Sequence, residues 1–180
     1  MFFSLLFLTG LLGFSFCKEY KAVDDLDLKQ YIGTWYQVYG DNFNKLFQGN
    51  GKCSTATYEF TSEDEVSVLN KQLSTNDEKE SISGYAYYSD GDCCGYLTVQ
   101  LEDLSPASYW VLELGPVVND SYDYAIVSDD FAFSLFVLAR NVTDFYENYN
   151  EDVLESLDEF GFNKLWNYPT VMNQANCSYF

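Results

Sequence analysis

The sequence contains no histidine, and its 9 Lys plus Arg residues face 28 Asp plus Glu, for a formal net charge of -19. Without histidine, the chain lacks the most common general base at neutral pH and the most common zinc ligand. An acidic surface repels phosphate groups, which argues against a nucleic-acid partner. We therefore predict no enzyme activity, no catalytic residue, no metal site, no cofactor and no nucleic-acid binding.

The sequence also lacks a Pro/Gly/Ser-rich linker and an internal repeat, and its 180 residues suit one domain with a substantial core. The segment 1–17 carries no charged side chain, and it is shorter than the ~20 apolar residues that a membrane-spanning helix needs. Such a segment is typical of a secretory signal peptide, and the small residues Ser15 and Cys17 place cleavage before Lys18. We predict a signal peptide over 1–17, one domain over 18–180 and a secreted, extracellular protein; an uncleaved anchor is the alternative.

The number of cysteines and the Asn-x-Ser/Thr tripeptides are consistent with a secreted protein. Loss of Cys17 with the signal peptide leaves an even number of cysteines, as expected for disulfides in an oxidising compartment. Asn119 and Asn141 are predicted glycosylation sites. Asn176 heads a third such tripeptide, but Cys177 is its middle residue, so a disulfide could block it.

Two cysteines, Cys93 and Cys94, are adjacent in the turn DGDCCGY. In a secreted protein we expect them to form a vicinal disulfide rather than to stay reduced. A redox pair is the other alternative, although such pairs normally have two intervening residues.

Eight short runs of alternating residues follow one another between residues 33 and 140. In the clearest run, Leu97, Val99 and Leu101 share one face. Eight antiparallel strands can close into a barrel that holds one small ligand and leaves no free sheet edge, with a two-sheet sandwich as the alternative. The predicted strands cover residues 33–40, 52–60, 66–74, 81–89, 95–102, 108–115, 122–128 and 132–140.

One segment, residues 150–161, has the pattern of a helix. Asn150 is expected to cap its start and Gly161 to end it. An apolar stripe predicts that this helix packs on the outside of the sheet; the stripe consists of Val153, Leu154, Leu157 and Phe160.

Four motifs in this order of elements resemble the lipocalin family, in particular its apolipoprotein D and bacterial lipocalin branch. They are Gly33-Thr34-Trp35-Tyr36, GKCSTATY at 51–58, VSVLNKQLS at 66–74, and YWVL at 109–112 together with VLARN at 137–141. The resemblance implies an all-β fold, an eight-stranded antiparallel up-and-down β-barrel with one C-terminal α-helix packed outside. It also implies a protein that binds and transports a small hydrophobic ligand such as a lipid, sterol, retinoid or tetrapyrrole.

The resemblance further assigns structural roles. In the family, the tryptophan of the first strand closes the barrel floor and an arginine of the last strand lies across its ring. Trp35 and Arg140 match these positions, and Gly33 is the glycine of the same motif. A guanidinium over an indole contributes about 0.5–2 kcal/mol. The resemblance also implies a disulfide between Cys53 and Cys177.

Alternate residues of the strands are expected to line the cup. An inward Leu, Val or Phe is simply core in any barrel, whereas a buried polar atom costs roughly 1–3 kcal/mol unless something pairs with it. The polar members of the set are therefore the more informative ones. The predicted ligand-binding residues are Tyr58, Asn70, Gln72, Val99, Leu101, Tyr109 and Phe136.

The loop after the first strand carries Phe43, Leu46 and Phe47. These side chains are predicted either to touch lipid surfaces or to tuck into the mouth of the cup. Two other function classes stay open, namely a lipid-modifying enzyme on the same fold and a protein-interaction module whose barrel is filled by its own side chains.

Overall fold

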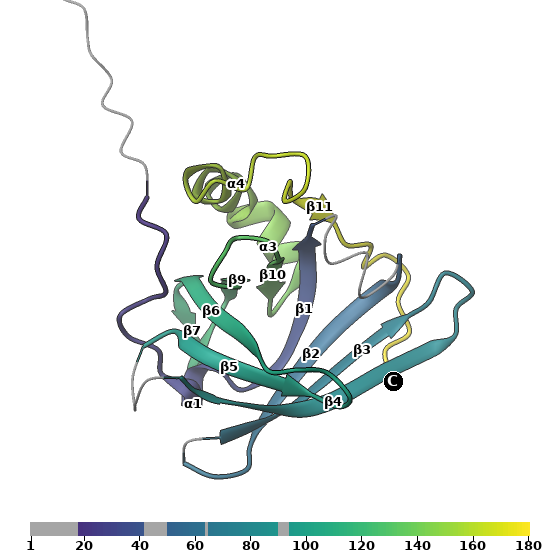
Figure 1. Ribbon diagram of the computed structural model, residues 1–180. Coiled ribbons are helices and arrows are strands. Elements are labelled where there is room, and N and C mark those ends of the chain that lie inside the picture. Colours follow the sequence, from purple (N-terminus) through teal and green to yellow (C-terminus); the bar gives the residue numbers. More distant parts are fainter. Residues whose placement is uncertain (1–17, 42–49, 64, 90–93) are drawn as a thin grey trace, which may run out of the picture.

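The computed structural model describes residues 18–41, 50–63, 65–89 and 94–180, and its centre is a closed antiparallel β-barrel (Figure 1). Neighbouring strands pair in sequence order, and the last barrel strand also pairs with the first, which closes the sheet on itself. Within the described residues the barrel strands are β1 (Gly33–Gly40), β2 (Lys52–Phe60), β3 (Glu65–Leu73), β4 (Lys79–Tyr88), β5 (Tyr96–Leu101), β6 (Ala107–Leu114), β9 (Tyr124–Ser128) and β10 (Leu135–Ala139).

The predicted eight-stranded barrel is confirmed, and the alternative sandwich is excluded by the pairing of β10 with β1. The predicted ranges of β1 and β2 match the observed ones, and the others differ by at most three residues at either end. Strand β9 starts two residues later than predicted, because Tyr122 belongs to a separate hairpin. This hairpin pairs β7 (Val117–Val118) with β8 (Ser121–Tyr122). Asn119 and Asp120 form its two-residue turn with φ angles of 50° and 61°, as such tight hairpins require.

The helical region is longer than predicted. It begins with α3 (Val142–Asn148), which Asn141 caps, because the Asn141 side chain accepts hydrogen bonds from the backbone of Thr143 and Asp144. The second helix, α4 (Asn150–Glu159), has no side-chain cap. The prediction of a single helix capped by Asn150 is therefore wrong: the Asn150 side chain instead accepts a hydrogen bond from the Tyr39 hydroxyl at 2.7 Å.

Helix α4 packs outside the barrel, as predicted (Figure 1). Val153 and Leu157 of the apolar stripe are fully buried, whereas Leu154 is 36% exposed and does not belong to the packed face. Gly161 ends the helical region with a φ of +88°, a left-handed conformation that glycine adopts at low cost.

Two cores lie on opposite sides of the barrel wall. The inner core fills the closed part of the barrel and includes Trp35, Tyr58, Val111 and Leu138. The outer core lies between the wall and the helices, where Phe145 and residues such as Val137 of β10 pack together. Because both faces of β9 are covered, all five of its residues are buried.

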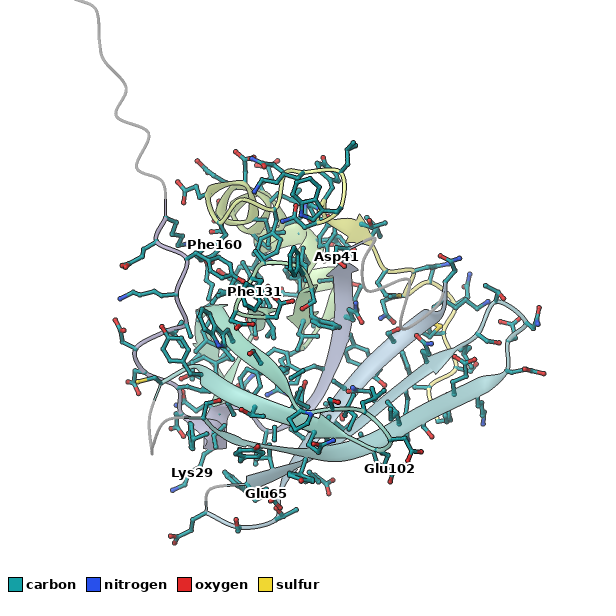
Figure 2. The ribbon with its side chains drawn as sticks, viewed as in Figure 1. Lys29, Asp41, Glu65, Glu102, Phe131 and Phe160 are labelled. Atoms are coloured by element: carbon teal, nitrogen blue, oxygen red, sulfur yellow. A yellow bond between two sulfur atoms is a disulfide. The ribbon has the colours of Figure 1, made fainter. Side chains whose placement is uncertain are left out.

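Helix α1 (Leu28–Tyr31) lies at one end of the barrel, which we call the closed end. The sequence predicted only a polar lead-in here, but Leu26, Leu28 and Tyr31 of this segment are part of the inner core. Lys29 marks the closed end, and Asp41, directly after β1, lies toward the opposite end, which we call the open end (Figure 2).

The C-terminal segment runs along the open end beside β1. Its strand β11 (Thr170–Val171) pairs with the last two residues of β1, and the Cys53 amide donates to the carbonyl of Asn173. The structure contains the disulfide between Cys53 and Cys177, with 5.5 Å between the two Cα atoms, and so ties this segment to β2.

Some predictions fall outside the described residues and stay predictions. They concern the signal peptide with Cys17, the apolar loop residues Phe43, Leu46 and Phe47, and the vicinal disulfide, because Cys93 is not described. Within the described ranges, no helix is long and apolar enough to cross a membrane.

Candidate ligand-binding site

The floor of the barrel is built around Trp35, whose side chain is fully buried. The guanidinium carbon of Arg140 lies 3.7 Å from the centroid of the Trp35 ring. The same guanidinium donates hydrogen bonds to main-chain carbonyls on both sides of it, those of Gln30, Tyr31, Ile32, Thr34 and Tyr122. Burial lowers the pKa of Arg140 from its ordinary value, but an arginine stays charged at neutral pH. Both the ring and the charge are thereby held across the closed end.

Gly33 is required by this floor for two reasons. Its φ is +101°, a conformation that residues with a Cβ rarely adopt. A Cβ at this position would also lie only 3.1 Å from Nη1 of Arg140. The glycine therefore allows the chain to pass close beneath the guanidinium just before Trp35.

Three tyrosines meet above the floor, and we call them the tyrosine triad. The Tyr109 hydroxyl on β6 lies 2.7 Å from the hydroxyl of Tyr31 on α1 and 3.0 Å from that of Tyr58 on β2. Burial raises the pKa of all three, that of Tyr58 to about 12. All three hydroxyls are therefore protonated and neutral at physiological pH.

The triad holds one more proton than it can use internally. Three hydroxyl groups carry three protons, but the chain from Tyr31 through Tyr109 to Tyr58 contains only two hydrogen bonds. Whichever way the hydroxyls rotate, one proton has no acceptor within the triad. A buried donor without a partner costs roughly 1–3 kcal/mol, so this group is poised to bind an oxygen or nitrogen acceptor.

A small cavity of about 10 Å³ adjoins the triad. This volume is close to the minimum that accommodates one water molecule. Its wall is apolar, and it is lined by Leu28, Tyr31, Ile32, Tyr58, Val66, Ala86, Leu97, Val99 and Tyr109.

Residues of the inner face become partly exposed to solvent toward the open end of the barrel. Leu101 and Phe136 pack against the inner core yet are only partly buried, in contrast to the fully buried residues near the floor. Asn70 is also partly exposed, and it pairs with Ala56 of the inner core across the β2–β3 ladder. Solvent therefore reaches the inner face in this half of the barrel, which has the form of an open cup.

The predicted site residues divide between these two regions. Tyr58, Val99 and Tyr109 line the small cavity. The other four belong to the open half, where Gln72 donates to Glu80 at 2.8 Å; they are Asn70, Gln72, Leu101 and Phe136.

Tyr31 is the one member of the triad that the sequence analysis missed. The segment before the first strand reads as a polar lead-in, so no cavity residue was expected there. The available signal was position: Tyr31 stands four residues before Trp35, within reach of the same floor, and its carbonyl accepts the Trp35 indole proton at 2.8 Å.

The barrel is closed, its floor is plugged by Trp35 and Arg140, and a helix flanks its wall. These features define a cup-shaped binding protein. The lipocalin-like domain family model matches residues 26–167, and the chain belongs to this family. It is 33% identical to the outer membrane lipoprotein Blc of Vibrio cholerae over 137 residues, 76% of each chain. It is also 28% identical to mouse apolipoprotein D over 171 residues, 89% of this chain and 84% of the relative.

Solved structures show the same fold at lower identity. Lobster apocrustacyanin A1 superposes with a TM-score of 0.62 at 16% identity, covering 88% of this chain and 93% of its own. The amine-binding protein of Rhodnius prolixus, in its tryptamine complex, superposes with a TM-score of 0.60 at 16% identity, covering 91% and 90%.

Proposed function

We propose that this protein binds and carries a small hydrophobic molecule in the cup, with a polar atom of the ligand accepting the surplus proton of the tyrosine triad. The observation that carries this proposal is that surplus donor, surrounded by apolar walls below a cup that solvent reaches. Binding sites for small molecules typically combine a mostly apolar wall with a few polar groups that fix orientation. The ligand classes that fit are lipids, sterols, retinoids and tetrapyrroles.

The relatives support the same role. The Rhodnius prolixus structure is a complex with tryptamine, so a barrel of this fold can hold a small molecule. The superposition supports a shared fold, but at 16% identity it does not indicate that the present chain binds the same ligand.

We propose binding without catalysis. A tyrosine whose pKa lies at or above about 12 is a poor base or nucleophile at neutral pH, since almost none of it is ionised. Within the described residues, no three Asp, Glu, Cys or His side chains cluster in a way that could hold a metal ion.

A titration with a panel of apolar ligands, followed by intrinsic tryptophan fluorescence, tests the proposal. Replacing Tyr31, Tyr58 and Tyr109 together by Phe removes every hydroxyl of the triad, whereas any single replacement leaves at least one proton without an acceptor in the triad. The triple variant should weaken binding of an oxygen-bearing ligand about fivefold to tenfold. Tyr87→Phe is the matched control, because Tyr87 is 37% exposed on the outer face of β4. No saturable change with any ligand would refute the binding function.

We also propose that the protein is secreted after cleavage before Lys18. Its Cys53–Cys177 disulfide suits an oxidising compartment. Asn119 and Asn141 are both exposed, and the cap formed by Asn141 uses its side-chain oxygen, which leaves the amide nitrogen for a glycan. N-terminal sequencing of the exported protein and its mass before and after deglycosylation test this proposal. A mature chain that retains Cys17 would contradict it.

One observation favours a second candidate, a protein-interaction module with a filled barrel. The cavity at the triad has room for about one water molecule, as expected where side chains fill the interior. Such a module would bind none of the apolar ligands while keeping its fold, so the same titration separates the two functions.

A further inference from the structure

Gln37 on β1 is a buried polar residue with an unused hydrogen-bond donor. Its side chain is only 4% exposed, and its amide nitrogen Nε2 has no hydrogen-bond partner among the described residues. Gln37 pairs directly with Leu138 of the inner core and stands two residues after Trp35. Direct partners in an antiparallel ladder share one face, so the amide points into the barrel.

The backbone of Gln37 is held by the C-terminal segment. Nε2 of Gln174, in the C-terminal segment, donates to the main-chain carbonyls of Gln37 and Ser54, each at 2.8 Å. This bridge fills the gap where β1 and β2 separate beyond their last paired residues, Tyr36 and Thr55. The backbone of Gln37 is therefore held firmly, while its side-chain Nε2 has no partner among the described residues.

A polar row leads from Gln37 to the rim of the cup. Ser54 is 5% exposed, and its hydroxyl lies 3.4 Å from Oε1 of Gln72, whose own amide nitrogen donates to Glu80 at 2.8 Å. The outer members of the row thus bond to one another. Only the innermost donor, that of Gln37, lacks an acceptor among the described residues.

The charges around the cup favour a neutral acceptor. Glu80 places a carboxylate at the rim, which repels an anionic ligand. Arg140 is held at the floor by Trp35 and five carbonyls. The other described cations lie on the outside of the barrel, where Lys29 is exposed (Figure 2). Three of them form ion pairs: Lys18 with Glu113, Lys21 with Asp24, and Lys52 with Asp77. Three others lie over aromatic rings: Lys71 and Lys79 over Phe180, and Lys164 over Trp166.

We propose that Gln37 determines specificity, its amide donating to a neutral oxygen of the ligand, such as a ketone, ester or alcohol, and that carboxylates are disfavoured. The inference rests on the proposed function and adds the chemical class of the ligand. A buried donor with no partner among the described residues gains a full hydrogen bond when such a ligand enters. A hydrocarbon offers no acceptor, and a carboxylate meets no free cation among the residues that the structure describes.

The test compares three ligands of equal chain length, 2-undecanone, undecane and undecanoate, by displacement of the neutral dye N-phenyl-1-naphthylamine at neutral pH. The wild-type protein should bind 2-undecanone about fivefold to tenfold more tightly than either of the others. Gln37→Met, which keeps the length of the side chain and removes the amide, should reduce the advantage over undecane to the part that the tyrosine triad supplies. Gln100→Met, on the outer face of β5, should leave it unchanged.

Thermal unfolding of the ligand-free variants separates a specificity role from a structural one. Gln37→Met should melt no lower than wild type, because it removes a buried amide nitrogen that has no hydrogen-bond partner among the described residues. A clear loss of stability, or a ketone advantage that is unchanged in Gln37→Met, would overturn the inference while the binding function stands. If the wild type bound neither the dye nor any of the three ligands, the proposed function would fail and the inference with it.

Discussion

Removing the Arg140 guanidinium should destabilise the fold strongly, and the structure allows the magnitude to be worked out. Two of its hydrogen bonds are short, 2.7 Å to the carbonyl of Ile32 and 2.9 Å to that of Thr34. Hydrogen bonds to charged groups contribute about 1.5–3 kcal/mol each, and the contact with Trp35 adds about 0.5–2 kcal/mol. The carbonyl of Tyr31 keeps its bond from the Trp35 indole, so it is not left unsatisfied.

Arg140→Met should therefore lower the free energy of unfolding by about 3–5 kcal/mol, less than the simple total because water can replace part of the hydrogen bonding. For a domain of this size the loss corresponds to roughly 6–20 °C in melting temperature. Urea unfolding, followed by tryptophan fluorescence and near-ultraviolet circular dichroism, measures it. Arg140→Lys keeps the charge but not the planar fork, and it should recover less than half of the loss.

A double-mutant cycle with Trp35→Leu, which removes the aromatic face, isolates the contact between the ring and the charge. The coupling energy should be about 0.5–2 kcal/mol, because the guanidinium carbon lies 3.7 Å from the ring centroid. If Arg140→Met cost less than 1 kcal/mol, or if the two substitutions were additive, the floor would not depend on this pair and the reasoning would be refuted.

Two further predictions concern the disulfide and the triad. Replacing Cys53 and Cys177 together by Ser should cost about 2–5 kcal/mol in urea unfolding, because the bond joins residues 124 apart in sequence and restricts the unfolded chain; an unchanged midpoint would contradict this. Burial raises the pKa of Tyr58 to about 12 from 10 in the unfolded chain, so its contribution is fully present below pH 10 and is lost as the pH rises toward 12. The loss should amount to about 3 kcal/mol and be smaller in Tyr58→Phe, as measured by urea unfolding between pH 9 and 12.

The barrel was predictable because alternation and turn residues report directly on strands. Most barrel strands alternate between an inner face and an outer face, which leaves a period of two in the sequence. Strand β9 is buried on both faces and lacks this alternation, so its short apolar run and the flanking turn residues indicate it. The floor could also be anticipated, because Gly33, Trp35 and Arg140 lie in recognisable motifs. Their geometry explains the motifs: the glycine is needed where Arg140 passes within 3.1 Å of its missing Cβ.

The helical region was less predictable for a local reason. Asn141 and Asn150 both stand before helical sequence, and both can serve as caps. Tertiary packing decides between them, because Asn150 is used by the Tyr39 hydroxyl whereas the Asn141 side chain meets two free amides. A sequence pattern contains the candidates for a cap but not the competing partner from a strand more than a hundred residues away.

The polar interior was the least predictable part, since it depends on which groups lack partners. Tyr58 and Tyr109 were expected inside, yet their hydroxyls bond to each other and to Tyr31, from a segment that shows no strand pattern. Gln37 lies in the best-recognised strand, but alternation alone does not reveal that its amide lacks a partner among the described residues. Whether a buried polar group has a hydrogen-bond partner depends on residues from several helices and strands, which a sequence pattern does not bring together.

Tyr31 joins the floor to the binding region. Its carbonyl accepts hydrogen bonds from Arg140 at 3.0 Å and from the Trp35 indole at 2.8 Å, while its hydroxyl lies 2.7 Å from that of Tyr109. The floor thus holds the backbone of Tyr31 in place, and the side chain of the same residue sets the position of the triad. The Trp35–Arg140 pair therefore helps to position the triad through Tyr31 without being part of it.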